Sequence, residues 1–254
     1  DFLRRMSHDV RTPINGIQGC VDIADRYPDD MKLQQEARTR IRTASSYLLN
    51  LVNDVLDMNK LESGNIQLER KHFNLLELLH NTNEITRMQA NESGVNYYVE
   101  DGEIIHTQLT GSPVHFQQIL MNIGSNAVKY NHNGGSVTVT CREVSYTDTT
   151  AEYELTCTDT GIGMSEEFQK RAFEAFAQEG QSARTKYAGT GLGLAIARKL
   201  TELQGGTLFF ESIQGKGTKF ILHISFEISA EEPEKKSYMY QNCSVEGIQV
   251  LLVE

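Results

Sequence analysis

The sequence has little cysteine and no paired cysteine motif. Its four cysteines, Cys20, Cys141, Cys157 and Cys243, lie far apart, and no two form a CxxC pair. Structural zinc sites and the disulfide frameworks of small secreted domains both depend on close, regular cysteine spacing. The pattern therefore fits neither kind of site and favours a reducing, cytosolic setting.

Long apolar runs and basic stretches are missing as well. No run approaches the roughly 18 to 20 apolar residues that cross a bilayer, and the chain opens on Asp1 without a signal-peptide pattern. The formal net charge is −10 and no basic stretch offsets it, so nucleic acid is not expected as a partner. The 254 residues allow one large domain or two ordinary ones, and we expect a soluble piece of a longer protein.

Residues 1–64 have a helical pattern with one break, around Pro28. Apolar residues step by threes and fours from Leu3 to Ala24, and again from Leu33 to Met58. This pattern predicts a hairpin of two long helices. Because a lone hairpin leaves its apolar seam uncovered, we expect a homodimer in which two hairpins form a four-helix bundle. The open alternative is that the hairpin packs on the C-terminal part of its own chain.

From residue 65 onward, short strands and helices alternate. The predicted strands are Ile66–Phe73, Val95–Val99, Thr107–Thr110, Ser136–Ser145, Ala151–Thr158, Thr207–Ser212 and Gly217–Ile228, and the predicted helices are Leu75–Ala90, Pro113–Tyr130 and Gly193–Gln204. Residues 65–228 thus read as an α/β sandwich. Residues 229–246 are polar and aperiodic, as linkers are, and residues 247–254 read as the start of another strand.

His8 lies off the apolar stripe of the first predicted helix. It is two residues from Met6, which is about 200° around a helix. Asp9 follows it directly, and Thr12 lies one turn further along the same face. The arrangement leaves the imidazole outside a bundle core, beside a carboxylate. The alternative for Thr12 is a local contact next to Pro13.

The predicted helix 113–130 places polar side chains on one face. Gln118, Asn122, Asn126 and Lys129 recur at intervals of four, four and three residues. Asparagine is a weak helix former, so a ligand explains this face better than helix stability does. Amide oxygens can bind Mg²⁺, and an ammonium group can neutralise phosphate oxygens. A solvated face that happens to carry amides is the alternative.

Two glycine-rich segments follow. "DTGIG", Asp159 to Gly163, comes directly after a strand, where a carboxylate can accept the exocyclic amine of adenine. "GTGLGL", Gly189 to Leu194, opens a helix, and N–H groups at such an end suit a polyphosphate. Neither segment matches a P-loop or GxGxxG, and the HRD and DFG signatures of protein kinases are missing.

These segments predict one nucleotide site. Adenine would lie at Asp159, Mg²⁺ at Asn126 and the phosphates at the loop that ends at Gly193. Residues 164–188 lie between them and are rich in Gln, Ser, Ala and Gly, with Arg184 and Lys186 as basic residues. This composition is typical of a mobile lid over a nucleotide.

Five motifs in their order and spacing resemble those of the sensor histidine kinases of two-component systems. They are "FLRRMSHDVRTPING" (the H box), "QQILMNIGSNAVKY" (the N box), "DTGIG" (the first glycine box), "FEAF" (the F box) and "GTGLGL" (the second glycine box). The resemblance covers residues 1 to about 228. The tail "VLLVE" looks like the first strand of a receiver domain, which implies a hybrid kinase as the parent protein.

The resemblance implies ATP and Mg²⁺ as cofactors and assigns a role to each matching residue. His8 would be the phospho-acceptor, Asp9 the base beside it, and Thr12 a residue that helps water attack in a phosphatase reaction. The implied nucleotide residues are Asn122, Asn126 (the Mg²⁺ ligand), Lys129, Tyr130, Asp159, Gly161, Gly163, the lid anchors Phe173 and Phe176, Arg184, Lys186, Gly189, Thr190, Gly191, Leu192 and Gly193.

The implied fold is a dimeric helical hairpin followed by an ATP-binding α/β sandwich of the gyrase, chaperone and histidine kinase type. The implied function is autophosphorylation of His8 and phosphotransfer to a response-regulator receiver domain, in the cytoplasmic part of a membrane-anchored parent. Two departures are visible: Asp9 replaces the commoner glutamate, and Ala188 interrupts the end of the lid motif. The rival functions are a plain ATPase of the same fold and a nucleotide-sensing dimeric scaffold without kinase activity.

Overall fold

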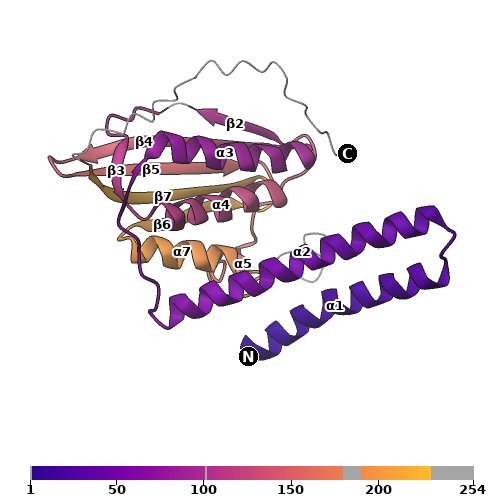
Figure 1. Ribbon diagram of the computed structural model, residues 1–254. Helices are drawn as coiled ribbons and strands as arrows, with labels where there is room; N and C mark the ends of the chain where they lie inside the picture. The colour runs from indigo at the N-terminus through magenta and orange to yellow at the C-terminus, as the bar shows by residue number, and fades with distance from the viewer. Residues whose placement is uncertain (1, 101, 180–189, 230–254) are drawn as a thin grey trace, which may run out of the picture.

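The computed structural model describes residues 2–100, 102–179 and 190–229, and within the first helix it describes side chains from Val10 onward. A long helical hairpin comes first and an α/β domain follows, as Figure 1 shows. The fold class predicted from the sequence is confirmed in this order of elements.

The hairpin consists of α1, Phe2–Arg26, and α2, Met31–Glu62. The predicted break is confirmed, because Asp30 caps α2 by accepting the backbone N–H groups of Lys32 and Leu33 at 3.1 and 3.0 Å. The side chain of Gln34 donates to the carbonyl oxygen of Ala24 at 2.7 Å and so ties the two helices together beside the turn. Pro13 lies inside α1.

In the part of the chain that the structure describes, seven strands form one sheet in the order β1-β3-β7-β5-β4-β2, with β6 also paired to β7. The strands are β1 Lys71–Asn74, β2 Asn96–Glu100, β3 Gln108–Gly111, β4 Ser136–Tyr146, β5 Thr150–Asp159, β6 Thr207–Ile213 and β7 Gly217–Ile228. Only the β2–β4 pair is parallel among these pairings.

Helices α3 (Leu75–Glu92), α4 (Pro113–Lys129) and α7 (Gly193–Leu203) lie on one side of this sheet (Figure 1). The core forms between the two layers, because alternate residues of β5 point inward and are buried. Phe116 of α4 and Tyr153 of β5 are both fully buried there. The short helix α5 (Glu166–Gln169) follows the end of β5.

One predicted strand is wrong at its start. Residues 66–70 have no regular structure, and β1 begins only at Lys71. The reason is the length of its partner, since β1 pairs with the four residues of β3 and no other strand in the described residues continues the ladder. The alternation of apolar residues before Lys71 therefore had no neighbour to pair with.

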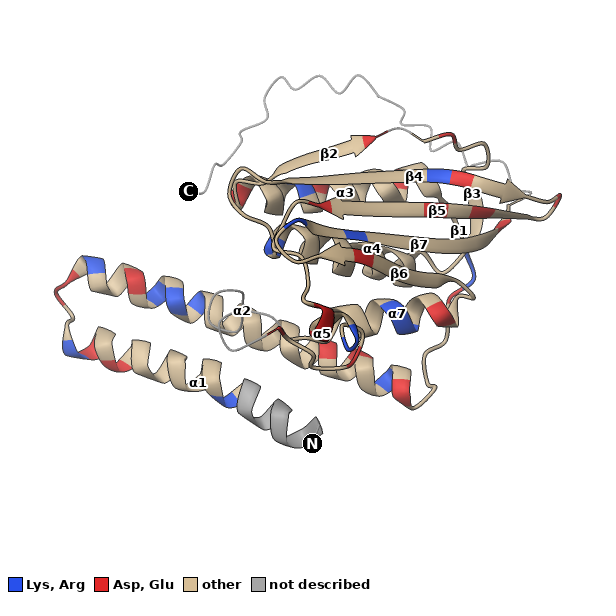
Figure 2. Ribbon diagram, turned by 180° about the vertical axis from the view of Figure 1, so that it is seen from behind, with Lys and Arg blue, Asp and Glu red and all other residues tan. Residues whose placement is uncertain are grey.

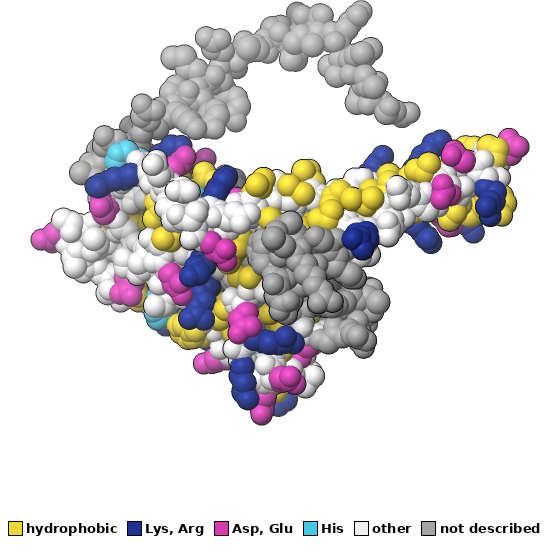
Figure 3. Space-filling model, turned by 90° about the horizontal axis from the view of Figure 1, so that it is seen from below, with side chains coloured by type: hydrophobic (Ala, Val, Ile, Leu, Met, Phe, Trp, Pro, Cys, Tyr) yellow, Lys and Arg dark blue, Asp and Glu magenta, His cyan; other side chains and the backbone are white. Residues whose placement is uncertain are grey.

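The two ends of α2 pack differently. Near its C-terminus, Met58 and Leu61 are buried within the same apolar cluster as the core of the α/β domain. Further toward the turn, Leu49, Val52 and Leu56 share a face and are 62%, 44% and 51% exposed. Figure 3 shows hydrophobic side chains running along this part of the hairpin. The predicted apolar stripe of α2 is buried at Leu51 and Met58. Leu49, Val52 and Leu56 form a second apolar stripe, the outer seam, which the sequence pattern did not predict and which stays open.

Charge is also unevenly distributed along the hairpin. Lys, Arg, Asp and Glu gather toward the turn, as Figure 2 shows, whereas residues 43–53 of α2 carry no charged side chain. Within the described residues, no helix is long and apolar enough to cross a membrane.

Candidate nucleotide site

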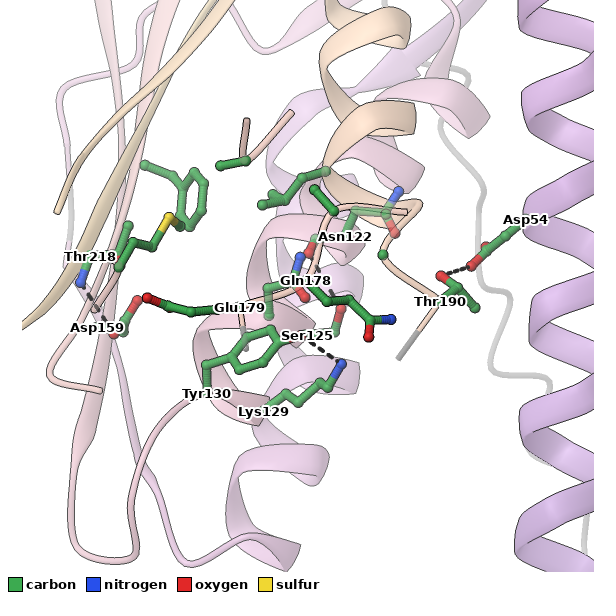
Figure 4. A pocket seen from close by; sticks show the side chains of 18 of the residues that line it. Asp54, Asn122, Ser125, Lys129, Tyr130, Asp159, Gln178, Glu179, Thr190 and Thr218 are labelled. Carbon is green, nitrogen blue, oxygen red and sulfur yellow. Dashed lines mark hydrogen bonds between the residues drawn. The ribbon is translucent and has the colours of Figure 1, made fainter. Parts of the chain in front are cut away.

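A cavity of about 480 Å³ lies between α2, α4 and the loops that follow β5 and precede α7. Figure 4 shows Asp159 and Thr218 on one side of it and Thr190 with Asp54 on the other. Lys129 and Tyr130 reach in from the end of α4, so segments far apart in the sequence line one space.

The polar face of α4 supplies one wall. Asn122, Asn126 and Lys129 line the cavity, while Phe116 and Ile123 on the other side of the helix are buried in the core. This is the division that the helical spacing predicts. Gln118 belongs to the same face but does not line the cavity. Its side chain donates instead to a carboxylate oxygen of Asp57 on α2 at 2.8 Å.

Asp159 lies at the end of β5 and is 6% exposed. Its Oδ1 accepts the backbone N–H groups of Gly161 at 2.8 Å and Thr218 at 3.3 Å. Burial raises the pKa of this carboxyl group to about 6, although both hydrogen bonds act in the opposite direction. Neither bond uses Oδ2, so this oxygen is available as an acceptor for a ligand.

The glycines beside Asp159 allow a close approach between backbone segments. A Cβ at Gly161 would lie 2.3 Å from the carbonyl oxygen of Tyr130. A Cβ at Gly163 would lie 2.1 Å from the carbonyl oxygen of Ile213, and Gly163 has a φ of +61°. Larger residues therefore do not fit this turn, which holds Asp159 against the end of α4.

The second glycine-rich loop leads into α7 along the opposite wall. Thr190, Gly191 and Gly193 line the cavity. Leu192 is fully buried and caps α7 from behind the loop. A Cβ at Gly193 would lie 3.2 Å from Oδ1 of Asn122, so this glycine brings the N-terminus of α7 close to the amides of α4. A helix N-terminus next to neutral amides is suited to bind an anion.

Phe173 and Phe176 hold the segment that leads away from α5. The backbone N–H of Phe176 donates to the carbonyl oxygen of Gly191 at 2.9 Å, and Phe176 has a φ of 63°, which is uncommon for a residue other than glycine. The ring of Phe173 lies 5.3 Å from that of Phe210, with the guanidinium group of Arg198 4.8 Å above it. The ring of Phe173 and the backbone of Phe176 therefore fix this segment to the body of the domain.

Lys129 and Tyr130 form a pair at the mouth of the cavity. Nζ of Lys129 donates to the Tyr130 hydroxyl at 3.0 Å and lies 4.5 Å from the centre of its ring. Burial lowers the pKa of Lys129 to about 8. Burial also raises the pKa of Tyr130, and the nearby carboxylate of Glu179 adds to this effect.

The structure gathers Asn122, Asn126, Lys129, Tyr130, Asp159, Gly163, Thr190, Gly191 and Gly193 around one cavity. Arg184, Lys186 and Gly189 lie outside the described residues. His8 and Asp9 belong to α1, but their side chains also lie outside the described part. Thr12 is exposed on α1 and does not line the cavity.

Sequence reasoning missed several residues of the site. They are Tyr47, Asn50, Asn53 and Asp54 from α2, Gln178 and Glu179 after the second phenylalanine, and Thr218 of β7. The α2 residues resemble an ordinary solvated helix face. The one available signal was the lack of charge in residues 43–53, which contrasts with the charged residues on either side.

The donor set fits a purine nucleotide. A carboxylate oxygen on one side can accept an exocyclic amine, and the ammonium group of Lys129 with the N-terminus of α7 can receive phosphate oxygens. The amide oxygens of Asn122 and Asn126 are hard ligands of the kind that bind Mg²⁺ next to phosphates.

Two family models match the chain. Residues 1–64 match the His Kinase A (phospho-acceptor) domain, and residues 111–228 match the histidine kinase-, DNA gyrase B-, and HSP90-like ATPase. The two matches cover the hairpin and most of the α/β domain.

Several curated proteins are similar over most of the chain. The sensory/regulatory protein RpfC of Xanthomonas campestris pv. campestris is 33% identical over 93% of this chain. The signal transduction histidine-protein kinase BarA of Escherichia coli is 32% identical over 90%, and the autoinducer 2 sensor kinase/phosphatase LuxQ of Vibrio cholerae is 32% identical over 100%. The chain spans 32%, 25% and 30% of these proteins.

Solved structures share the fold. The structure of full-length ShkA in complex with AMPPNP has a TM-score of 0.64 and 28% identity, and the match covers 90% of this chain and 46% of that one. The histidine kinase ThkA in complex with the response regulator protein TrrA has a TM-score of 0.66 over 90% of this chain and 61% of that one, at 22% identity.

Proposed function

The chain carries the catalytic core of a sensor histidine kinase, and we propose that it transfers the terminal phosphoryl group of ATP to His8 and then to an aspartate of a response-regulator receiver domain. The observation that carries the proposal is the nucleotide cavity itself. It is lined by the three segments expected to bind the nucleotide, which are the polar face of α4, the loop around Asp159 and the loop that ends at Gly193. It is closed on one side by α2, the helix that pairs with α1.

Counting residues along the hairpin supports a position for residue 8 level with this cavity. Gln34 contacts Ala24 across the antiparallel helices, and both helices rise by about 1.5 Å per residue. Counting back from Ala24 and forward from Gln34 by equal steps places position 8 of α1 level with Asn50 of α2. Because Asn50 lines the cavity, the backbone geometry supports transfer from a nucleotide in the cavity to His8.

The proposed reaction needs positioning more than covalent chemistry. One imidazole nitrogen of His8 would attack the terminal phosphorus, the bond from that phosphorus to the bridging oxygen would break, and ADP would leave with the electron pair. Asp9 would hold the proton on the other ring nitrogen and stabilise the positive charge that forms. In a phosphatase reaction, Thr12 would orient a water molecule toward the phosphoryl group on the aspartate of the receiver domain.

The nucleotide roles follow from the cavity. Asp159 would accept the adenine amine, with Gly161 and Gly163 beneath the base and Tyr130 beside the nucleoside. Lys129 and the loop from Thr190 to Gly193 would hold the phosphates. Mg²⁺, when bound, would neutralise phosphate charge, and Asn126 is the residue proposed to hold it.

Labelling with γ-labelled ATP and Mg²⁺ tests the proposal. Wild type should gain acid-labile, alkali-stable label, and His8→Ala should lose it. His80→Ala is the matched control, because His80 is an exposed histidine on α3, away from the cavity. Label that survives in His8→Ala contradicts the assignment. No label on wild type would instead support the rival function, a scaffold that senses nucleotide without kinase activity.

The proposal extends to the whole protein. Partners would be a second copy through the hairpin and a receiver domain in the same chain or another one. Three further statements stay predictions. They are that residues 229–246 form a linker, that residues 247–254 begin a receiver domain, and that this part of the parent protein is cytoplasmic.

A further inference from the structure

The carboxylate of Asp54 on α2 accepts a hydrogen bond from a hydroxyl group of the loop that is expected to bind phosphate. Oδ2 of Asp54 accepts a hydrogen bond from the hydroxyl of Thr190 at 2.7 Å, as Figure 4 shows. The two residues are separated by most of the α/β domain in sequence, and both line the nucleotide cavity. This bond therefore joins the helical hairpin to the loop in front of α7.

The one proton of the Thr190 hydroxyl is engaged in this arrangement. The hydroxyl donates to Asp54, and it accepts the backbone N–H of Leu192 at 3.2 Å. Thr190 itself is 8% exposed, so water does not replace these partners freely. A hydroxyl has one proton to donate, so a phosphate oxygen that needs this donor has to displace the carboxylate.

The carboxylate of Asp54 takes part in no ion pair among the residues that the structure describes. Burial and the neighbouring carboxylate of Asp57 both raise the pKa of Asp54, while the bond to Thr190 lowers it. An incoming polyphosphate would thus meet a negative group of the hairpin where the loop offers positive potential.

A second contact holds the same two parts together without touching the cavity. Asp57, one turn further along α2, accepts from the side chain of Gln118 on α4 at 2.8 Å. Neither Asp57 nor Gln118 lines the cavity. The structure thus separates a contact that only docks the α/β domain on α2 from one that also occupies the phosphate loop.

We propose that Asp54 is a latch that competes with the nucleotide phosphates for the Thr190 loop. In the latched arrangement the α/β domain is docked on α2 and binds nucleotide weakly. Phosphates entering the loop displace Asp54 and loosen the α/β domain from α2 at this point. Because coupling is reciprocal, anything that pulls α2 away from the loop raises the affinity for nucleotide to the same degree. The inference rests on the nucleotide binding of the proposed function and adds a regulator to that site.

The test compares Asp54→Asn with Asp57→Asn in the full chain. Both substitutions are close to isosteric and remove one negative charge from the same helix, but only the first removes charge from the cavity. The ligands are a non-hydrolysable ATP analogue with Mg²⁺, and adenosine, which has no phosphate. Binding is measured by calorimetry, so the readout does not depend on kinase activity.

Asp54→Asn should bind the ATP analogue about five- to tenfold more tightly than wild type, as expected for removing one charge near the phosphates. Asp57→Asn should change the affinity by less than about twofold, since its charge is further away and partly screened. Adenosine binding should stay the same in all three proteins. Asp54→Glu keeps the charge and should not gain affinity.

Amide hydrogen exchange provides a second readout. In wild type, the ATP analogue should increase exchange in residues 50–58 of α2, whereas in Asp54→Ala, which has no acceptor for the Thr190 hydroxyl, this exchange should already be raised without nucleotide. Equal gains in Asp54→Asn and Asp57→Asn, or no gain in Asp54→Asn, would overturn the latch. Failure of wild type to bind the analogue would instead overturn the nucleotide site itself.

Discussion

The α/β domain encloses Phe116 and Tyr153 completely, whereas the middle of α2 leaves Leu49, Val52 and Leu56 about half exposed. The first region has two layers of its own and can bury its apolar side chains within one chain. The second is a pair of helices whose outer seam has no third layer among the described residues. The difference shows that the α/β domain closes its own layers, with Met58 and Leu61 of α2 joining its core, while the hairpin leaves an apolar face open.

The largest expected effect is in the core of the α/β domain. Phe116→Ala should destabilise this domain by about 3–5 kcal/mol, because the ring is fully buried and packs 5.0 Å from the ring of Phe226. Urea unfolding, followed by amide exchange in β5 and β7, measures the loss. Leu49→Ala in the hairpin is the control and should leave the exchange of these strands unchanged. Similar losses from both would mean that the two regions are not independent.

The next largest effect is expected on self-association through the outer seam of α2, which contains Leu56. Leu56→Arg should weaken self-association at least about a hundredfold, because a charge without a partner would be buried in the bundle. Sedimentation over a range of concentrations measures it. Leu76→Arg on α3 is the matched control, with 49% exposure against 51% for Leu56. If Leu56→Arg associates like wild type, the partner of the hairpin is not a second copy through this face.

A third test measures how the ionisation of Asp159, a residue of the α/β domain, changes the affinity for nucleotide. The pKa of Asp159 is raised to about 6, so the carboxyl group becomes neutral as pH falls below that value. An ionised acceptor is then lost, and affinity for an ATP analogue should fall about fivefold from pH 6 to pH 5. The contribution of Asp159 to domain stability has the opposite sign, because a raised pKa favours the folded state at low pH and this benefit is lost as pH rises through 6.

The variant Asp159→Asn tests whether Asp159, and not another titrating residue, causes the pH dependence of nucleotide affinity. The variant should bind weakly throughout and show no fall between pH 6 and pH 5. If the variant shows the wild-type slope, a different residue titrates. The association state should stay constant over this range, since Asp159 lies in the α/β domain and not in the hairpin.

The smallest effect is at Lys129. Its pKa is lowered to about 8, so the affinity for an ATP analogue should fall about fourfold from pH 7 to pH 8.5 as the ammonium group loses its proton. Adenosine serves as the control ligand, because it has no phosphate for Lys129 to neutralise. Lys129→Arg should keep its charge and remove the pH dependence. A fall for adenosine as well would point to Tyr130 or the base pocket instead.

The features that could be predicted from the sequence are those that depend on local residue spacing and residue type. The break at Pro28, the buried and polar faces of α4, and the carboxylate of Asp159 between a strand and glycines all follow from spacing and residue type. The strand expected from Ile66 failed because pairing depends on the length of a distant partner, β3.

The residues of α2 that line the cavity could not be predicted from the sequence for a related reason. Asn50, Asn53 and Asp54 are ordinary residues of an exposed helix face until the α/β domain lies against them. Which face of a helix meets another domain depends on long-range packing, which no local pattern records. The strand order of the sheet has the same origin.

Pro13 has a consequence for the helix that carries position 8. Proline has no backbone N–H, so the carbonyl group of Asp9, four residues earlier, lacks its donor within α1. The stretch before Pro13 is about three turns long, a length at which an isolated helix is marginal in water. Its amide protons should exchange faster than those of residues 17–26. The N-terminal part of α1 is thus stable only as far as its neighbours hold it, so the helices packed against it set its helix–coil equilibrium.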